Sequence, residues 1–239
     1  MNPMIIVACF AFLGGIVQGV TGFGAGIVMM MVLPVFFLIP QAAGISSTIG
    51  LMLNSLMAYR YRKSINLKKA IIPSTLFLVV SSCSAYFAMY VNQVLIKKIF
   101  GIFLMILSIY YLFIQKNNEK KKLSLFISLI CIVVSAICDG LFGIGGPLMV
   151  LYFLAQTDNT YENLGTIQTL ILINCIYNTI FRIYRGILLI EHLPLILMGV
   201  FGIIIGGLIA NKIVNKLDGM MIKKLTYVMI GISGLINII

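Results

Sequence analysis

The feature that most constrains the fold is a glycine-rich stretch, Gly19–Gly26, which lies inside a long apolar run. A second copy, Gly140–Pro147, stands 121 residues later, with glycines at three matching places and Pro147 in the place of Gly26. Glycine interrupts a helix through its backbone freedom, and proline does so through its missing N–H. Inside a membrane, an interrupted helix is tolerated only where protein or a water-filled cavity satisfies the freed backbone groups. Two matched interruptions in two halves of a chain therefore indicate the binding site of a transporter.

The membrane assignment comes from composition. Hydrophobic residues make up 61% of the 239 residues and charged residues 10%, far from the roughly 45–50% and 25% of soluble domains. Several apolar runs approach the length of about 20 residues that a membrane span needs. The N-terminal run has no Lys or Arg before it and no obvious cleavage site, so we expect a retained first span. The chain is predicted to be a multi-pass protein of the cell membrane.

The net charge of +11 does not indicate nucleic-acid binding, because the 17 basic residues lie mostly at the ends of apolar runs. The five cysteines all lie in apolar segments and form no Cys-x-x-Cys pair. Such thiols are typical packing residues. We therefore expect no disulfide, no metal site and no cofactor.

The apolar runs predict an all-α fold with five helical elements in each half. A polar linker, residues 116–122, separates a first transmembrane repeat, 1–115, from a second, 123–239. In the first repeat the elements are expected at Met4–Gln18, Ala25–Ile39, Ala42–Tyr59 and Pro73–Val91, followed, after a turn marked by Lys97 and Lys98, by one that reaches Ile114. In the second they are expected at Leu123–Asp139, Pro147–Ala155, Tyr161–Tyr184, Pro194–Ile213 and Met220–Ile239. Pro73 and Pro194 are again 121 residues apart, which supports an internal repeat.

The distribution of basic residues predicts how the two repeats are oriented. Five elements per half would make the repeats inverted, which places 13 basic residues on one side and 4 on the other. A parallel arrangement would give a weaker bias of 11 to 6. The positive-inside rule favours the inverted arrangement, with the linker in the cytoplasm and both termini outside it. The elements at 25–39 and 147–155 are short, so whether the first two elements of each repeat fully span the membrane stays open.

The two glycine breaks are the first candidate site. A helix that starts inside the membrane presents free N–H groups and the positive end of its dipole, which attract anions. The alternative for these glycines is close helix packing, which we assign to Gly202 and Gly206. A dinucleotide fingerprint is excluded, because Gly22-Phe23-Gly24 follows no strand. The predicted substrate-binding residues at the breaks are Gly22, Phe23, Gly24, Ala25, Gly26, Gly143, Ile144, Gly145 and Gly146.

The segment Gly140–Tyr152 and its weaker echo, Gly19–Pro34, resemble the two repeats of the TauE/SafE sulfite exporter family, also called the toluene-sulfonate uptake permeases. The resemblance covers both halves, including the turns Tyr61–Ile65 and Tyr184–Leu188. It implies a multi-pass carrier of sulfite, sulfonates or related anions. Two departures bear on the substrate: Gly165 precedes Thr166 where members often have Arg, and the first break reads Gly-Ala-Gly.

Polar side chains inside the apolar runs complete the predicted site. Asp139 is the acid inside such a run, and it is either a proton-coupling residue or a cap on the broken helix. Its counterpart in the first repeat is Gln18, which cannot titrate. The third elements contribute the candidate substrate contacts Thr48, Asn54, Thr166, Gln168 and Asn174, for which interhelical bonding is the alternative.

Three residues near helix ends are expected outside this site. His192 is interpreted as a surface residue. Arg182 and Arg185 are interpreted as interfacial side chains that reach toward the headgroups, with contact to the substrate on its way through as the alternative.

Together these features predict a transporter of small sulfur-containing anions, an exporter by family resemblance, coupled to protons through Asp139. The alternatives are an anion channel or a carrier of another small organic anion. An intramembrane protease is excluded because it needs an Asp pair or a Ser–His pair within the membrane. We therefore expect no catalytic residues, no enzymatic activity and no nucleic-acid partner. The expected partners are the anionic substrate and membrane lipid, and the sequence leaves the oligomeric state open.

Overall fold

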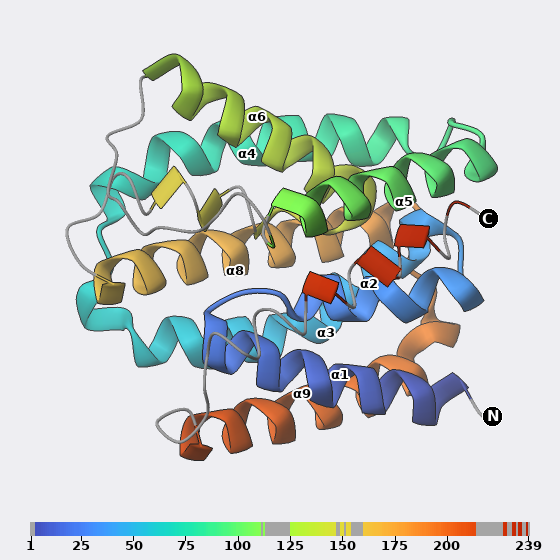
Figure 1. Ribbon diagram of the computed structural model, residues 1–239, viewed down its shortest axis with the longest axis horizontal. Helices are drawn as coiled ribbons and strands as arrows, with labels where there is room; N and C mark the ends of the chain where they lie inside the picture. Colours follow the sequence, from blue (N-terminus) through green and yellow to red (C-terminus); the bar gives the residue numbers. More distant parts are fainter. Residues whose placement is uncertain are drawn as a thin grey trace.

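The computed structural model describes residues 3–110, 112, 125–146, 149, 150, 152, 153 and 160–213, together with seven positions between 227 and 238. Within these ranges the chain is helical with short turns and contains no strand, which confirms the all-α fold (Figure 1). The linker at 116–122 and the predicted start of the last element lie outside the described residues. Four of the described helices are long and apolar enough to cross a membrane: Pro3–Thr21, Ala70–Phe87, Tyr161–Tyr184 and Ile190–Lys212.

The first half contains five helices in the predicted order. They are α1 (Pro3–Thr21), α2 (Ala25–Phe36), α3 (Ile39–Arg60), α4 (Leu67–Phe87) and α5 (Gln93–Ile109), with a 3-10 turn at Arg62–Ser64. In the second half the described helices are α6 (Leu125–Phe142), α8 (Thr160–Tyr184) and α9 (Leu193–Ile213), with a 3-10 turn at Ile190–His192. Residues 146, 149, 150, 152 and 153 and the seven C-terminal positions are also helical.

Three predicted boundaries are wrong, and the local chemistry explains each of them. Pro40 begins α3 and does not end α2, because a proline in the first turn of a helix lacks only an N–H that would be unpaired anyway. Pro73 lies inside α4. This helix begins six residues earlier, at Leu67, and includes the apolar residues before Pro73. Lys97 and Lys98 lie inside α5, because Asn92 already caps this helix by accepting a bond from the Val94 amide at 2.9 Å.

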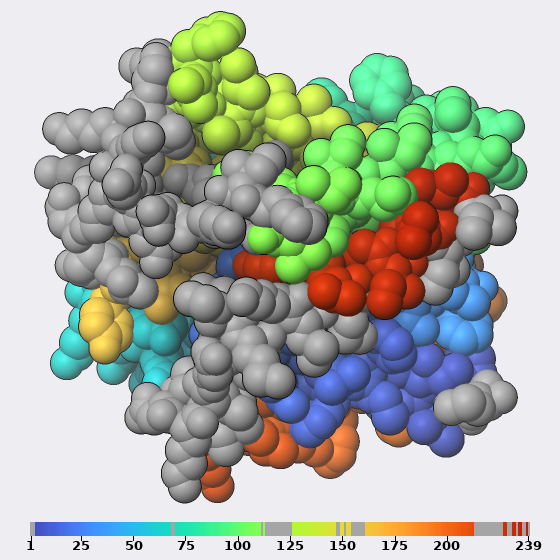
Figure 2. Space-filling model, viewed as in Figure 1, coloured from blue at the N-terminus to red at the C-terminus, as the bar shows by residue number. Residues whose placement is uncertain are grey.

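The two halves interlock, because each broken helix packs against the fourth helix of the other half. Helix α1 packs along α9, α6 packs along α4, and α3 lies against α8 between these pairs. Figure 2 shows α9 emerging beneath α1 along one edge of the molecule. A side chain at Gly202 or Gly206 would collide with the backbone of Ala8 or Phe12, respectively, on α1. The packing role predicted for these two glycines is therefore confirmed.

The directions of the helices bear on the predicted inversion. In Figure 1, α1 and α6 point in opposite directions, and so do α3 and α8. Helix α2 begins at Ala25 and α3 begins at Ile39, and the residues 121 positions later, Gly146 and Thr160, are also helical. An inverted repeat requires both this equal spacing and the opposite directions of corresponding helices. For the chain as a whole the inverted repeat stays a prediction, because parts of the second half lie outside the described residues.

Candidate functional site

The first break is formed by a helix that ends on a glycine and a second helix that begins two residues later. The Gly22 amide donates to the Gln18 carbonyl at 2.8 Å, and its φ of +85° ends α1. Gly24 then has a φ of +109° and stands before the first residue of α2. Residues with a side chain rarely adopt these angles, so the break depends on glycine at both positions.

The second break repeats this geometry at the end of α6. The Gly143 amide donates to the Asp139 carbonyl at 2.7 Å, and the φ of Gly143 is +67°. Two residues later, the carbonyl of Gly145 accepts a hydrogen bond from the Ser135 hydroxyl, which fixes the turn against α6. Helical backbone resumes at Gly146.

The start of α2 presents backbone N–H groups that have no partner in the described part of the chain. Along α2, the first backbone amide that donates a helical hydrogen bond is that of Val28, which donates to the Gly24 carbonyl at 3.1 Å. Among the described residues, nothing accepts a hydrogen bond from the amides of Gly24, Ala25, Gly26 or Ile27. Unpaired amides at a helix N-terminus, together with the positive end of the helix dipole, form a favourable place for an anion.

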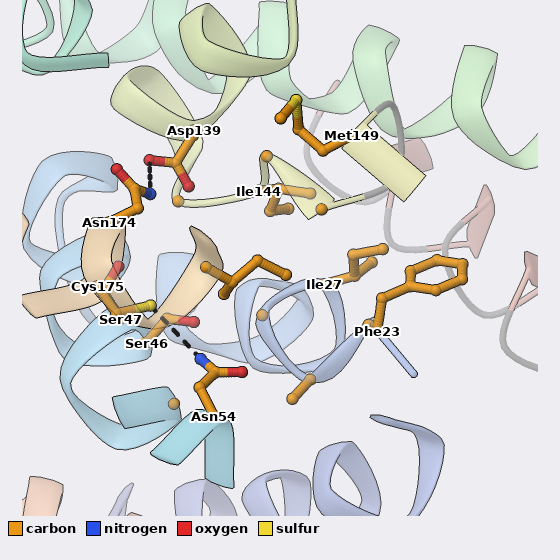
Figure 3. Close-up of a pocket in the computed structure, with 18 of the residues that line it drawn as sticks. Phe23, Ile27, Ser46, Ser47, Asn54, Asp139, Ile144, Met149, Asn174 and Cys175 are labelled. Atoms are coloured by element: carbon orange, nitrogen blue, oxygen red, sulfur yellow. Dashed lines mark hydrogen bonds between the residues drawn. The ribbon is translucent and has the colours of Figure 1, made fainter. Parts of the chain in front are cut away.

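The structure brings the two breaks into contact. A Cβ placed on Gly26 would lie 3.2 Å from the Gly143 carbonyl oxygen, and one placed on Gly146 would lie 3.8 Å from Cβ of Phe23. Between the breaks is a cavity of about 70 Å³ (Figure 3), several times the roughly 10–15 Å³ that one water molecule requires. The cavity is therefore large enough for a small anion with some of its water.

Helices α3 and α8 close the cavity with polar side chains. Ser46 is buried, and its hydroxyl has no hydrogen-bond partner among the described residues. Asn54 accepts a bond from Nε2 of Gln18 at 2.6 Å, and its own amide donates to Sγ of Cys175 at 3.5 Å. Asn54 and Cys175 are themselves 121 residues apart, so equivalent positions of the two halves meet beside the cavity.

Asp139 offers the cavity one carboxylate oxygen and keeps the other in a network. Its Oδ2 accepts hydrogen bonds from Asn174 at 2.7 Å, Ser81 at 2.8 Å and Asn178 at 3.0 Å. Its Oδ1 lies 3.2 Å from the place that a Cβ on Gly145 would occupy. In Figure 3 one carboxylate oxygen of Asp139 is joined to Asn174 by the dashed hydrogen bond, and the other oxygen points away from Asn174. Three donors on one oxygen hold the carboxyl group in a fixed orientation beside the second break.

Most of the predicted site residues line this cavity. They are Phe23, Gly24, Ala25, Gly26, Asn54, Asp139, Gly143, Ile144, Gly145, Gly146 and Asn174. Gly22 is not part of the lining, although its carbonyl accepts a bond from Gln168, which is buried behind it. Thr48 bonds the Gly44 carbonyl and Thr179, and Thr166 accepts from the Asn66 amide at 3.1 Å. These two threonines hold helices together, which was the alternative considered for them.

Sequence reasoning missed three buried side chains, two of them in or next to this site. Ser46 gave no signal beyond being one of several polar residues on α3. Arg182 was expected at the interface but is fully buried, because the small residue Gly44 on α3 leaves room for its side chain. His192 was expected on the surface but is buried against Phe37, with its Nδ1 accepting a bond from the Leu189 amide at 3.0 Å.

Comparison with known proteins adds a second line of support. The family described as sulfite exporter TauE/SafE matches residues 7–236. The chain is also similar to a probable membrane transporter protein of Methanocaldococcus jannaschii, with 31% identity over 170 residues, which is 64% of this chain and 61% of that protein. The match thus spans less than two thirds of the length of this relative. No solved structure matches the chain.

Proposed function

Because the chain belongs to the sulfite exporter TauE/SafE family of membrane transporters, we propose that it carries small sulfur-containing anions, sulfite or organosulfonates, out of the cell. The observation that supports this substrate class is the set of amides at the start of α2 that have no partner among the described residues and belong to residues that line the cavity shared by the two breaks. An oxyanion supplies several acceptors at once, and charge-assisted bonds to it are stronger than bonds between neutral groups.

The cavity binds the anion between the two breaks. The amides of residues 24–27 and the hydroxyl of Ser46 donate to its oxygens, while Phe23, Ile144 and Met149 enclose its apolar part. A sulfonate combines an oxyanion head with an apolar body, and the lining combines the same two properties. Among the described residues that line the cavity there is no Lys or Arg, so backbone and hydroxyl groups provide the recognition.

Asp139 couples transport to protons in this proposal. An ionised carboxylate repels an anion bound beside it, whereas a protonated carboxyl group does not. If an anion sits about 5 Å from Asp139, two unit charges at an effective dielectric constant of about 20 repel each other by about 3 kcal/mol. The anion therefore binds together with a proton on Asp139, or leaves when that proton is lost. The equivalent residue of the first half is Gln18, which cannot take up or release a proton, so the proton coupling is limited to the second half.

Adjacent serines on α3 provide a matched test of the binding mode. Ser46 has a free hydroxyl in the cavity, whereas the hydroxyl of Ser47 already donates to the Ala43 carbonyl at 2.8 Å. Ser46→Ala is expected to weaken binding of an alkylsulfonate by about 1–2 kcal/mol, on the order of tenfold. Ser47→Ala removes the same atom and should leave the affinity within about twofold. The measurement is calorimetric titration of purified protein in detergent.

Equal losses in the two serine variants would count against recognition by the Ser46 hydroxyl. A wild-type protein that binds neither sulfite nor any sulfonate would reject the proposed substrate class altogether.

A further inference from the structure

Arg182 is a charged side chain that the binding cavity does not use. It lies in the last turn of α8 and is fully buried. Its Nη2 donates to the Gly140 carbonyl at 3.0 Å, whereas its Nε and Nη1 have no hydrogen-bond partner among the described residues. A buried guanidinium with two unused donors is costly in an apolar protein, so an ionisable group of this kind marks a functional position.

Contacts and positions on three helices place Arg182 next to one end of the cavity. On α6 it bonds Gly140, which directly follows the lining residue Asp139. On α3 it packs on Gly44, two residues before the lining residue Ser46. On α8 it stands seven residues after the lining residue Cys175, which is about 10 Å along a helix. The positions on α3 and α8 lead away from the cavity toward the end of α8, and the bond to Gly140 keeps the guanidinium next to the lining residues of α6.

The end of α8 lies on the predicted extracytoplasmic side. In Figure 1 it is at the same end of the molecule as the start of α1. Arg182 has no exposed surface, so other protein groups cover its side chain on this side of the cavity. An anion that leaves the cavity toward this side has to pass the guanidinium.

The opposite end of the α3–α8 pair has an equivalent arrangement with a different side chain. A Cβ on Gly44 would lie 3.2 Å from Cδ of Arg182, and one on Gly165 would lie 3.3 Å from Cβ of Tyr61. Gly165 follows Gly44, and Arg182 follows Tyr61, by the repeat distance of 121 residues. Near the end of each of these two helices, a large residue thus packs on a glycine of the other helix; this residue is Arg182 at one end and Tyr61 at the other.

We propose that Arg182 is the exit gate for the transported oxyanion: its free Nε and Nη1 bind the anion after it leaves the cavity, on the way to the side where α8 ends. Each of these two nitrogens forms one side of the guanidinium fork, next to Nη2, and offers an oxyanion a directed, charge-assisted bond, which a freely rotating ammonium group does not. The proposal rests on the proposed function. It adds a second anion contact that favours three-oxygen anions over spherical ones such as chloride.

The test compares binding with transport for Arg182→Gln and Arg182→Lys. Because Arg182 lies outside the cavity lining, Arg182→Gln should bind an alkylsulfonate in detergent within about threefold of the wild type. Its sulfonate counterflow in proteoliposomes should fall at least tenfold. Arg182→Lys keeps the charge but loses the planar pair of donors, and its counterflow should fall severalfold.

Arg185→Gln is the matched control, because Arg185 lies on the same side of the molecule with its guanidinium 4.7 Å from the centre of the Tyr86 ring. Its counterflow should stay within twofold of the wild type. Size-exclusion profiles identify any variant that does not fold, and Arg182→Lys then carries the test by itself. Wild-type counterflow in Arg182→Lys would overturn the proposal.

A double variant separates a gate from a simple counter-charge for Asp139. If Arg182 only neutralises Asp139, the combination Asp139→Asn with Arg182→Gln should restore the counterflow to the level of Asp139→Asn alone, which would overturn the gate. The gate predicts that the double variant keeps the tenfold loss caused by Arg182→Gln. Absence of sulfonate counterflow in the wild type would instead reject the proposed function, which is a distinguishable result.

Discussion

Replacement of Asp139 by Asn is the most informative perturbation of the cavity, because the two side chains have the same shape. An Asn carbonyl in the place of Oδ2 still accepts the bonds from Asn174, Ser81 and Asn178. The change removes the charge and the ability to titrate, while each of the three bonds weakens from the range of about 1.5–3 kcal/mol for a charged acceptor to about 1 kcal/mol. Removal of a buried charge offsets part of that loss.

The expected effect on binding follows from the position of Oδ1 beside the second break. An anion held about 5 Å from the carboxylate is repelled by about 3 kcal/mol when Asp139 is ionised, which corresponds to a loss in affinity on the order of 100-fold. Wild-type affinity should therefore fall as the pH rises through the titration of Asp139. The affinity of Asp139→Asn should stay flat and close to the low-pH value of the wild type.

The assay is calorimetric titration of an alkylsulfonate across a range of pH. A sulfonate keeps its charge over this range, so any pH dependence belongs to the protein. The reasoning is refuted if the Asn variant shows the same pH dependence as the wild type, or if wild-type affinity rises with pH. Asp139 would then be only a structural cap for the end of α6.

Three further predictions concern the breaks, the helix packing and the topology. Gly143→Ala should abolish sulfonate binding, because position 143 needs a φ of +67° and the new Cβ would meet Ala43 at 3.1 Å. Gly146→Ala should bind sulfonate within a fewfold of the wild-type affinity, because its Cβ would lie 3.8 Å from Phe23. Similar affinities for the two variants would contradict the role of the break. Gly202→Val should reduce the yield of folded protein without changing the affinity of what remains, since Gly202 faces the backbone of α1, and a loss of affinity at normal yield would contradict this packing role. In a background without native cysteines, single thiols near Met1 and Ile239 should react with an impermeant reagent added outside cells, whereas one near Lys120 should not, and the reverse pattern would refute the predicted orientation.

Much of the fold and the central part of the site could be predicted because the informative residues are rare in apolar helices. Gly22, Gly24 and Gly143 have positive φ angles that other residues rarely adopt, so their density predicted the breaks. Asp139 could be identified in the same way, as an acid in an apolar run. The repeat distance of 121 residues, which separates the glycines of the two breaks and Pro73 from Pro194, also separates the helix starts Ala25 and Ile39 from the helical residues Gly146 and Thr160.

The rest depends on contacts between helices that periodicity does not encode. Thr166 and Ser46 are both small polar residues on central helices, yet Thr166 bonds the Asn66 amide and Ser46 faces the cavity. The burial of Arg182 depends on Gly44, which is 138 residues away in the chain. A signal was present, because Gly44 and Gly165 are 121 residues apart, but only the packing of α3 on α8 gives that spacing a meaning.

The central claim is that the cavity between the two breaks carries sulfur oxyanions by a saturable mechanism. Counterflow of labelled sulfite into proteoliposomes preloaded with unlabelled sulfite tests it most directly. We predict transient accumulation above equilibrium that saturates with sulfite concentration, is competed by alkylsulfonates and is lost in Gly143→Ala. Flux that follows the gradient without overshoot and rises linearly with concentration would show a channel and contradict the account.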